Sequence, residues 1–156
     1  MKTGKPLPLV ELAVLVFAAW QSLDLSVAWR HSPHDRFGWL ALLAWLTPLA
    51  LRLTDRPRVP LAANPWLLGS AILAGLLGQL TEVHFFGHVA LVLAVAAWVK
   101  ISWRLLPWLL SAVAWMPVFG WWLAGFSGWT VFALRVLLAL TGVFFLRPKF
   151  KIRTEP

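Results

Sequence analysis

Two histidines and two charged residues have the positions in this sequence that best suit chemistry. His84 and His88 are four residues apart, so on a helix they would share one face, as a metal-binding or proton-relay pair requires. Asp24 and Arg135 each stand within a long apolar stretch, where a charge costs about 2.5 to 3.5 kcal/mol on insertion and is usually paired or faces a cavity. What these four residues can do depends on the elements that place them.

The absence of cysteine removes one class of chemistry. With no Cys, the sequence excludes disulfides, thiolate metal ligands and a thiol nucleophile. No further ligand motif of fixed spacing accompanies the histidines, which are also ordinary residues at a membrane boundary. We therefore predict no metal site and no cofactor.

The composition indicates that lipid is the main solvent of this chain. Of its 156 residues, 60% are hydrophobic and 13% are charged, and the mean hydropathy is +0.76. A soluble domain of this size buries only about two-thirds of its unfolded surface, so much of this apolar area would face water. The net charge of +8 lies in short clusters between apolar segments, which argues against nucleic-acid binding. We predict an integral protein of a bacterial-type cytoplasmic (inner) membrane.

Six apolar segments predict an all-α, polytopic bundle of short transmembrane helices in a single domain, residues 1–156. The first segment is longer than the apolar part of a signal peptide and lacks a cleavage site, so we expect it to remain as a span. A tight hairpin is expected where the third segment meets the fourth. Tryptophans near segment ends, including Trp108, are expected to lie at the headgroup level. The segments cover residues 7–29, 39–53, 66–80, 85–99, 105–124 and 130–146, and a basic tail covers 147–156.

The distribution of Lys and Arg predicts that both ends are cytoplasmic. Eleven of these residues fall in the termini and one set of alternate loops, whereas the other set holds only Arg30 and Arg36. Cytoplasmic loops carry the excess of positive charge, and an even number of spans returns the chain to the side where it began. This topology gathers the remaining polar residues into one external cluster. Its members are His31, His34, Asp35, Arg36, Glu82, His84 and His88.

Equal depth predicts a pair between the two embedded charges. Asp24 lies five residues before the end of the first segment, and Arg135 lies five residues after the start of the sixth. Each is therefore about 7.5 Å below the external boundary at the rise of an α-helix. We favour a structural ion pair that joins the first and last helices, and the alternative is a contact with a substrate.

Four stretches follow one another in a recognisable order. They are WRHSPHDRFGW over 29–39, RLTDRPRVP over 52–60, LLGSAILAGLLG over 67–78 and RLLPWLLSAVAWMPVFG over 104–120. This order resembles the membrane core of the exosortase/archaeosortase family, in which a membrane-embedded cysteine follows, and then an arginine and a histidine, to carry out transpeptidation. The present sequence lacks the cysteine and has Phe37 where the family often has a histidine. The resemblance thus implies a shortened, catalytically silent relative and gives Arg135 no catalytic role.

Three functions are compatible with these features. The favoured one is a non-catalytic accessory or assembly subunit of a larger membrane complex with an exosortase-like core, whose partners are lipid and other membrane subunits. The second is an exosortase-like processing enzyme with a non-cysteine site, for which Ser127 and Arg135 are the candidates. The third is a small transporter or a lipid- or quinone-binding protein with a cavity lined by Gln21, Asp24, Gln79 and Arg135.

Overall fold

The computed structural model describes residues 9–55 and 63–146, and within these ranges the regular structure is helical, without a β-strand. The helices lie where the apolar segments predict them, but the first and fifth segments are each broken. The basic tail over 147–156 lies outside the described residues. In chain order the elements are α1 (Leu9–Gln21), α2 (Asp24–His31), α3 (Gly38–Asp55), α4 (Pro65–Thr81), α5 (His84–Ala96), α6 (Leu105–Ser111), the 3₁₀-helix η1 (Ala112–Trp115), α7 (Pro117–Trp122) and α8 (Gly128–Leu146).

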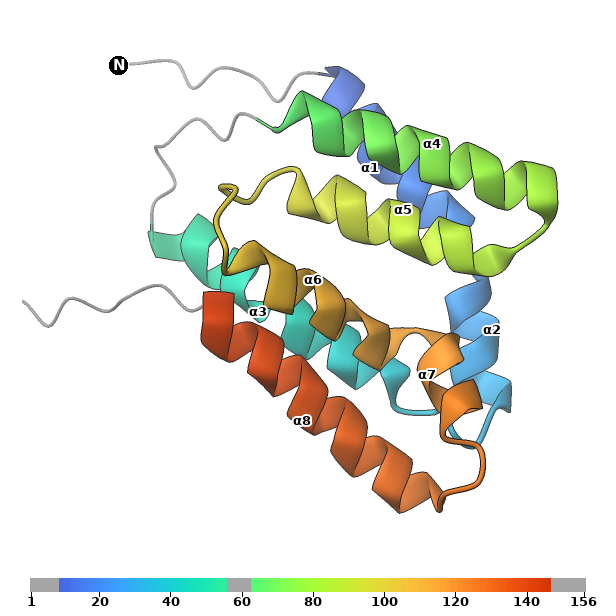
Figure 1. Ribbon diagram of the computed structural model, residues 1–156. Coiled ribbons are helices and arrows are strands. Elements are labelled where there is room, and N and C mark those ends of the chain that lie inside the picture. The colour runs from blue at the N-terminus through green and yellow to red at the C-terminus, as the bar shows by residue number, and fades with distance from the viewer. Residues whose placement is uncertain (1–8, 56–62, 147–156) are drawn as a thin grey trace, which may run out of the picture.

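The helices are arranged in two lobes (Figure 1). One lobe consists of α1, α4 and α5, and the other consists of α3, α6, η1 and α8. In Figure 1, α2 leaves the end of α1 and runs toward the second lobe, at the end of the molecule that also holds α7. The lobes also meet along α5, because Val92 and Ala96 belong to the same apolar cluster as Trp45 and Trp108 of the second lobe.

Small side chains let the helices of the first lobe approach closely. Ala71 and Ala74 of α4 are buried against Ala90 and Ala94 of α5 in one apolar cluster, and a side chain at Gly75 would overlap the ring of Phe17 in α1. Small residues at four-residue spacing are the usual means of close helix approach in membranes. Ala71 and Gly75 of α4, and Ala90 and Ala94 of α5, have this spacing.

Local signals set both ends of α4. The Asn64 side chain accepts hydrogen bonds from the backbone amides of Trp66 (2.9 Å) and Leu67 (3.4 Å), which is the N-cap that Asn followed by Pro predicts. Glu82 ends the helix with φ of 56°, and Val83 leads directly into α5. The tight hairpin expected between these two segments is confirmed.

Two tryptophans join α3 to α6 in the second lobe. Trp45 Nε1 donates to the Trp108 carbonyl (2.8 Å), Trp108 Nε1 donates to the Trp45 carbonyl (3.0 Å), and the rings stack with centroids 4.2 Å apart. Both side chains are fully buried. The prediction that Trp108 lies at the headgroup level is therefore wrong, because its indole N–H finds a partner inside the lobe.

Two breaks interrupt the long apolar stretches. Between α1 and α2 the backbone forms 3₁₀-type bonds, and the Ser22 hydroxyl donates to the carbonyls of Ala18 (3.1 Å) and Gly87 (3.2 Å). In the fifth stretch, Met116 is extended and Pro117 begins α7, since proline has no amide to continue a helix. Pro48, by contrast, lies inside a continuous α3.

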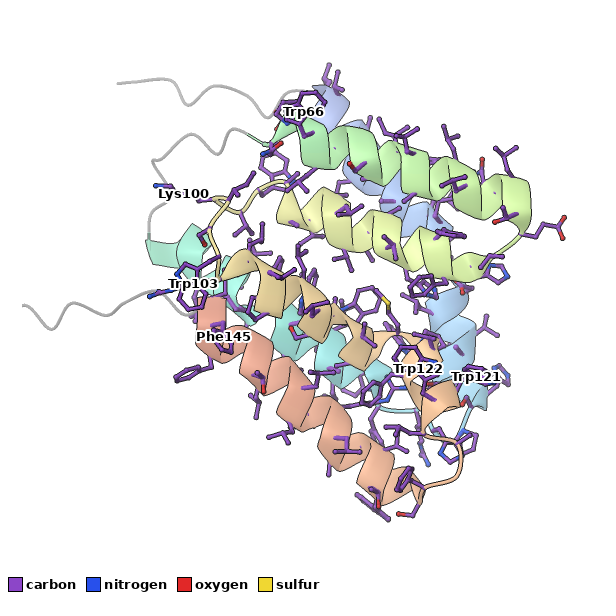
Figure 2. All side chains as sticks on the ribbon, viewed as in Figure 1. Trp66, Lys100, Trp103, Trp121, Trp122 and Phe145 are labelled. Atoms are coloured by element: carbon purple, nitrogen blue, oxygen red, sulfur yellow. The ribbon has the colours of Figure 1, made fainter. Side chains whose placement is uncertain are left out.

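The described part of the chain has two helical stretches that are long and apolar enough to cross a membrane, Leu9–His31 and Gly128–Leu146. Four further apolar helices are shorter: Gly38–Leu51, Pro65–Thr81, His84–Ala96 and Leu105–Trp115. Aromatic side chains lie at both ends of the molecule (Figure 2): Trp66, Trp103 and Phe145 share one end with Lys100, and Trp121 and Trp122 lie at the opposite end.

Candidate functional site

Arg135 of α8 is the most deeply buried charge among the described residues, with 1% of its surface exposed. Its Nη2 donates to Asp35 Oδ1, and its Nη1 donates to the carbonyl of Ala114 and, at 3.4 Å, to that of Met116. The backbone leaves helical geometry at Met116, so the Ala114 carbonyl lacks the amide that a continuous helix would supply. The guanidinium takes the place of that amide, because an unpaired buried carbonyl is costly.

The last turn of α7 covers this ion pair. Gly120 is buried, and a Cβ atom at this position would overlap both the Asp35 carboxylate and Arg135 Nη2. Arg135 also stacks over the ring of Phe119, with Cζ 5.3 Å from the ring centroid, which is a favourable cation–π distance. The position needs glycine because no larger residue would let α7 approach the pair so closely.

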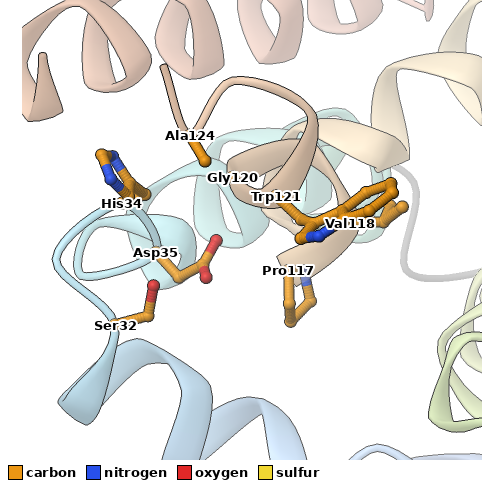
Figure 3. A pocket seen from close by; sticks show the side chains of 8 residues that line it. All are labelled: Ser32, His34, Asp35, Pro117, Val118, Gly120, Trp121 and Ala124. Atoms are coloured by element: carbon orange, nitrogen blue, oxygen red, sulfur yellow. The ribbon is translucent and has the colours of Figure 1, made fainter. Parts of the chain in front are cut away.

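A pocket of about 370 Å³ lies beside the ion pair, between the α2–α3 loop and α7 (Figure 3). The Asp35 carboxylate and the Ser32 hydroxyl lie on the loop side, and Pro117 and Trp121 lie on the α7 side. The pocket thus has one polar and one apolar wall. The residues that line it are Ser32, His34, Asp35, Pro117, Val118, Gly120, Trp121 and Ala124.

A second polar group lies where α2 begins. His88 Nε2 is 3.0 Å and 3.2 Å from the two carboxylate oxygens of Asp24, and His84 Nδ1 is 4.0 Å from Asp24 Oδ2. The His88 side chain is 4% exposed, whereas that of His84 is 75% exposed. His88 also meets the edge of Trp115, with ring centroids 6.3 Å apart. This group joins α2 to α5 and reaches η1 of the second lobe.

The predicted pair between Asp24 and Arg135 is wrong. Asp24 pairs with His88, and Arg135 pairs with Asp35. A pair at equal depth requires the first segment to be one straight helix, but the break at Ser22 and Leu23 directs α2 away from α1. The carboxylate of Asp24 consequently lies against α5, and Asp35 takes the place beside α8.

The residues of the predicted external cluster do not lie together. Asp35 and His34 belong to the pocket, and His84 and His88 belong to the Asp24 group. His31 is exposed, with Nδ1 2.9 Å from the Val27 carbonyl; the exposed Arg36 lies 5.9 Å from the Phe37 ring centroid; and Glu82 is exposed at the end of α4. Within residues 9–55 and 63–146, no three His, Asp or Glu side chains are arranged to hold a metal ion.

The residues proposed for the two alternative functions are also separated. Ser127 Oγ is 2.9 Å from Thr130 Oγ1 and accepts from the Thr130 amide (3.3 Å), so this hydroxyl caps α8 rather than meeting a histidine. Gln79 is exposed on α4, Gln21 is half-buried at the end of α1, and neither lines the pocket. The described residues thus contain neither a contact between Ser127 and a histidine nor a pocket lined by Gln21 and Gln79.

The role of Asp35 was missed by sequence reasoning, which placed it only in the external cluster. A signal was present, because Asp35 and Glu82 are the only acidic residues in the predicted external loops. Arg135 was predicted near that side of the membrane and needed an acidic partner. The helix break that separates Asp24 from Arg135 had no comparable signal, since Ser22 and Leu23 are compatible with a helix.

No protein-family model, curated protein or solved structure matches the chain.

Proposed function

We propose that this chain is a non-catalytic accessory or assembly subunit of a larger protein complex in a bacterial-type cytoplasmic membrane. The proposal rests on one observation: the buried polar groups bind other parts of the same chain. Arg135 and Asp35 tie α8 to the α2–α3 loop and to the broken backbone before α7, while Asp24 and His88 tie α2 to α5. These groups assemble the chain's own helices, while many large apolar side chains are left exposed on its outer surface.

The membrane location is supported by what the longest apolar helices expose. The two stretches long enough to cross a membrane are only 22% and 28% buried, whereas the core helix of a water-soluble protein would be mostly buried. Leu137 and Phe144 of α8 are 63% and 71% exposed. Because exposing such side chains to water costs about 1.5 to 3 kcal/mol each, lipid or a partner helix is the surrounding that this surface requires.

The proposed topology has six helical segments in the bilayer and both ends on the cytoplasmic side. The turns at 82–83 and 123–127 and the α2–α3 loop lie at one end of the molecule, and Lys100 lies at the other (Figures 1 and 2). This arrangement agrees with the sides assigned from the Lys and Arg count. The 13 residues of α5 measure only about 20 Å, so local thinning of the bilayer or neighbouring subunits would have to accommodate its length.

The proposal includes kinship to the exosortase/archaeosortase membrane core. Two of the stretches that carry the resemblance meet at the ion pair: residues 29–39 provide Asp35, and residues 104–120 provide the Ala114 carbonyl and Gly120. A shortened relative that keeps this packing without a cysteine would serve assembly rather than transpeptidation.

Copurification tests this function directly. The full chain carrying an affinity tag would be isolated in a mild detergent from its native host, beside an unrelated tagged membrane protein prepared identically. We expect a stoichiometric complex with at least one other membrane protein that is missing from the control. Isolation of the chain alone, at the mass of a single copy, would contradict the subunit role.

A further inference from the structure

The pocket beside Asp35 is the polar feature that the packing of the helices leaves open. The Asp35 carboxylate is held rigidly, because this side chain is only 8% exposed and Arg135 binds its Oδ1 atom. Among the described residues, neither Asp35 Oδ2 nor the Ser32 hydroxyl has a hydrogen-bond partner, and both residues line the pocket. The pocket therefore presents fixed acceptors to whatever enters it.

The chemistry of the two walls defines a ligand class. A carboxylate oxygen only accepts, and a serine hydroxyl can accept, so a ligand needs N–H or O–H donors on the loop side. Pro117, Val118 and Trp121 form the opposite wall, whose carbon groups and indole ring favour an alkyl ammonium. A primary ammonium satisfies both walls at once.

Charge balance restricts this class further. Arg135 already neutralises Asp35, so a second cation is favourable only if it brings its own counter-charge. Arg36 follows Asp35 in the α2–α3 loop, and Arg30 lies in the last turn of α2. Both side chains are exposed, and arginine pairs well with phosphate oxygens. A ligand with an ammonium and a phosphate a few bonds apart meets these requirements.

The position of the pocket indicates that this ligand is a lipid. Trp121 and Trp129 are each 75% exposed and Trp122 is 64% exposed, and indole rings of this kind favour the headgroup level of a bilayer. Acyl chains can then follow the exposed apolar surface next to the pocket. We propose that this pocket binds the headgroup of an ethanolamine phospholipid, with its ammonium at Asp35 and Ser32 and its phosphate toward Arg36. The inference rests on the proposed membrane location, and not on the subunit role.

Native mass spectrometry of the purified full chain tests the site. Phosphatidylethanolamine, phosphatidylcholine and phosphatidylglycerol with identical acyl chains would be titrated separately. We expect one retained phosphatidylethanolamine and about tenfold weaker retention of phosphatidylcholine, whose ammonium has no N–H to donate, since tenfold is a typical effect of one lost charge-assisted contact. Equal retention of the three lipids, or a preference for phosphatidylglycerol, would overturn the proposal.

Matched variants locate the binding. Trp121→Ala and Ser32→Ala should each weaken phosphatidylethanolamine retention several-fold, whereas Trp122→Ala should not, because Trp122 is the adjacent exposed indole and does not line the pocket. Loss in both tryptophan variants alike would show a general surface effect and overturn the site. Displacement of the lipid by free ethanolamine at equal concentration would also overturn it, by showing that a soluble amine suffices. A chain that cannot be recovered in membranes would refute the membrane location itself.

Discussion

The Arg135 guanidinium donates the hydrogen bond that a backbone amide would donate to Ala114 in a continuous helix. Arg135 is buried beside two groups that would otherwise lack a partner. They are the Ala114 carbonyl, where the helix is interrupted before α7, and the Asp35 carboxylate, which Gly120 covers. Removing one partner of such a pair leaves the other charged and buried, which is more costly than removing both. The sequence shows that Asp24 and Arg135 require partners, but the identity of each partner depends on a backbone break that local propensity does not reveal.

The first prediction is a double-mutant cycle on the ion pair. Arg135→Ala and Asp35→Ala should each destabilise the protein by about 3 to 5 kcal/mol, and the double variant should recover part of that loss. The measurement is thermal unfolding in detergent, together with the folded yield. Combining Arg135→Ala with Asp24→Ala is the control, because these residues have different partners and their losses should add. Recovery in the control but not in the Asp35 cycle would contradict the observed pairing.

The second prediction separates two histidines on one helix face. His88→Ala leaves the Asp24 carboxylate without its close partner and should cost about 1 to 3 kcal/mol. His84→Ala should change stability by less than about 0.5 kcal/mol, because the His84 side chain is 75% exposed and 4.0 Å from the carboxylate. Unfolding curves of the two variants give both values. Equal losses of stability would contradict this, because the exposed His84 would then contribute as much to holding Asp24 as the buried His88 does.

Glycines decide how closely the helices approach, and sequence alone does not distinguish the essential ones. Gly142 of α8 lies against α6, where an added Cβ would overlap the Ser111 side chain, whereas Gly69 of α4 has nothing within 4 Å of that position. Both stand inside apolar helices with small residues nearby. The small residues of α4 and α5 recur at the four-residue spacing of a close helix contact, but no such pattern identifies Ser111 of α6 as the neighbour of Gly142.

The third prediction compares these two mid-helix glycines. Gly142→Ala should destabilise the protein by about 1 to 3 kcal/mol through overpacking, and Ser111→Gly in the same chain should restore part of the loss. Gly69→Ala should be neutral or stabilising by up to about 1 kcal/mol, because alanine has the higher helix propensity. Thermal unfolding of the three variants and the parent is the measurement. Destabilisation by Gly69→Ala would indicate that α4 has a partner surface at that residue.

At the scale of the whole molecule, the sequence predicts where the helical segments lie, the α4–α5 hairpin and the opposite sides of the loops. The division into two lobes was not predictable, because it follows from the turn at Ser22 and Leu23 and from the departure of α2 toward α7. The number of membrane crossings is the property on which the remaining topology depends. Helix length alone supports two crossings, whereas the Lys and Arg pattern supports six.

The fourth prediction decides between these two counts by accessibility of single thiols. The chain has no cysteine, so Ser102→Cys and Ser127→Cys each create its sole thiol, and both positions are exposed. If only Leu9–His31 and Gly128–Leu146 cross the membrane, both thiols lie outside. If all six segments cross, Ser127→Cys remains outside but Ser102→Cys lies in the cytoplasm, because the fifth segment, residues 105–124, crosses the membrane between them.

We expect an impermeant maleimide added to intact cells to label Ser127→Cys, and to label Ser102→Cys only after the membrane is permeabilised. The parent chain measures background, since it offers no thiol. Labelling of both variants in intact cells would reject the six-span topology in favour of two crossings. Protection of Ser127→Cys until permeabilisation would instead reverse the orientation, and would place the pocket beside Asp35 on the cytoplasmic side.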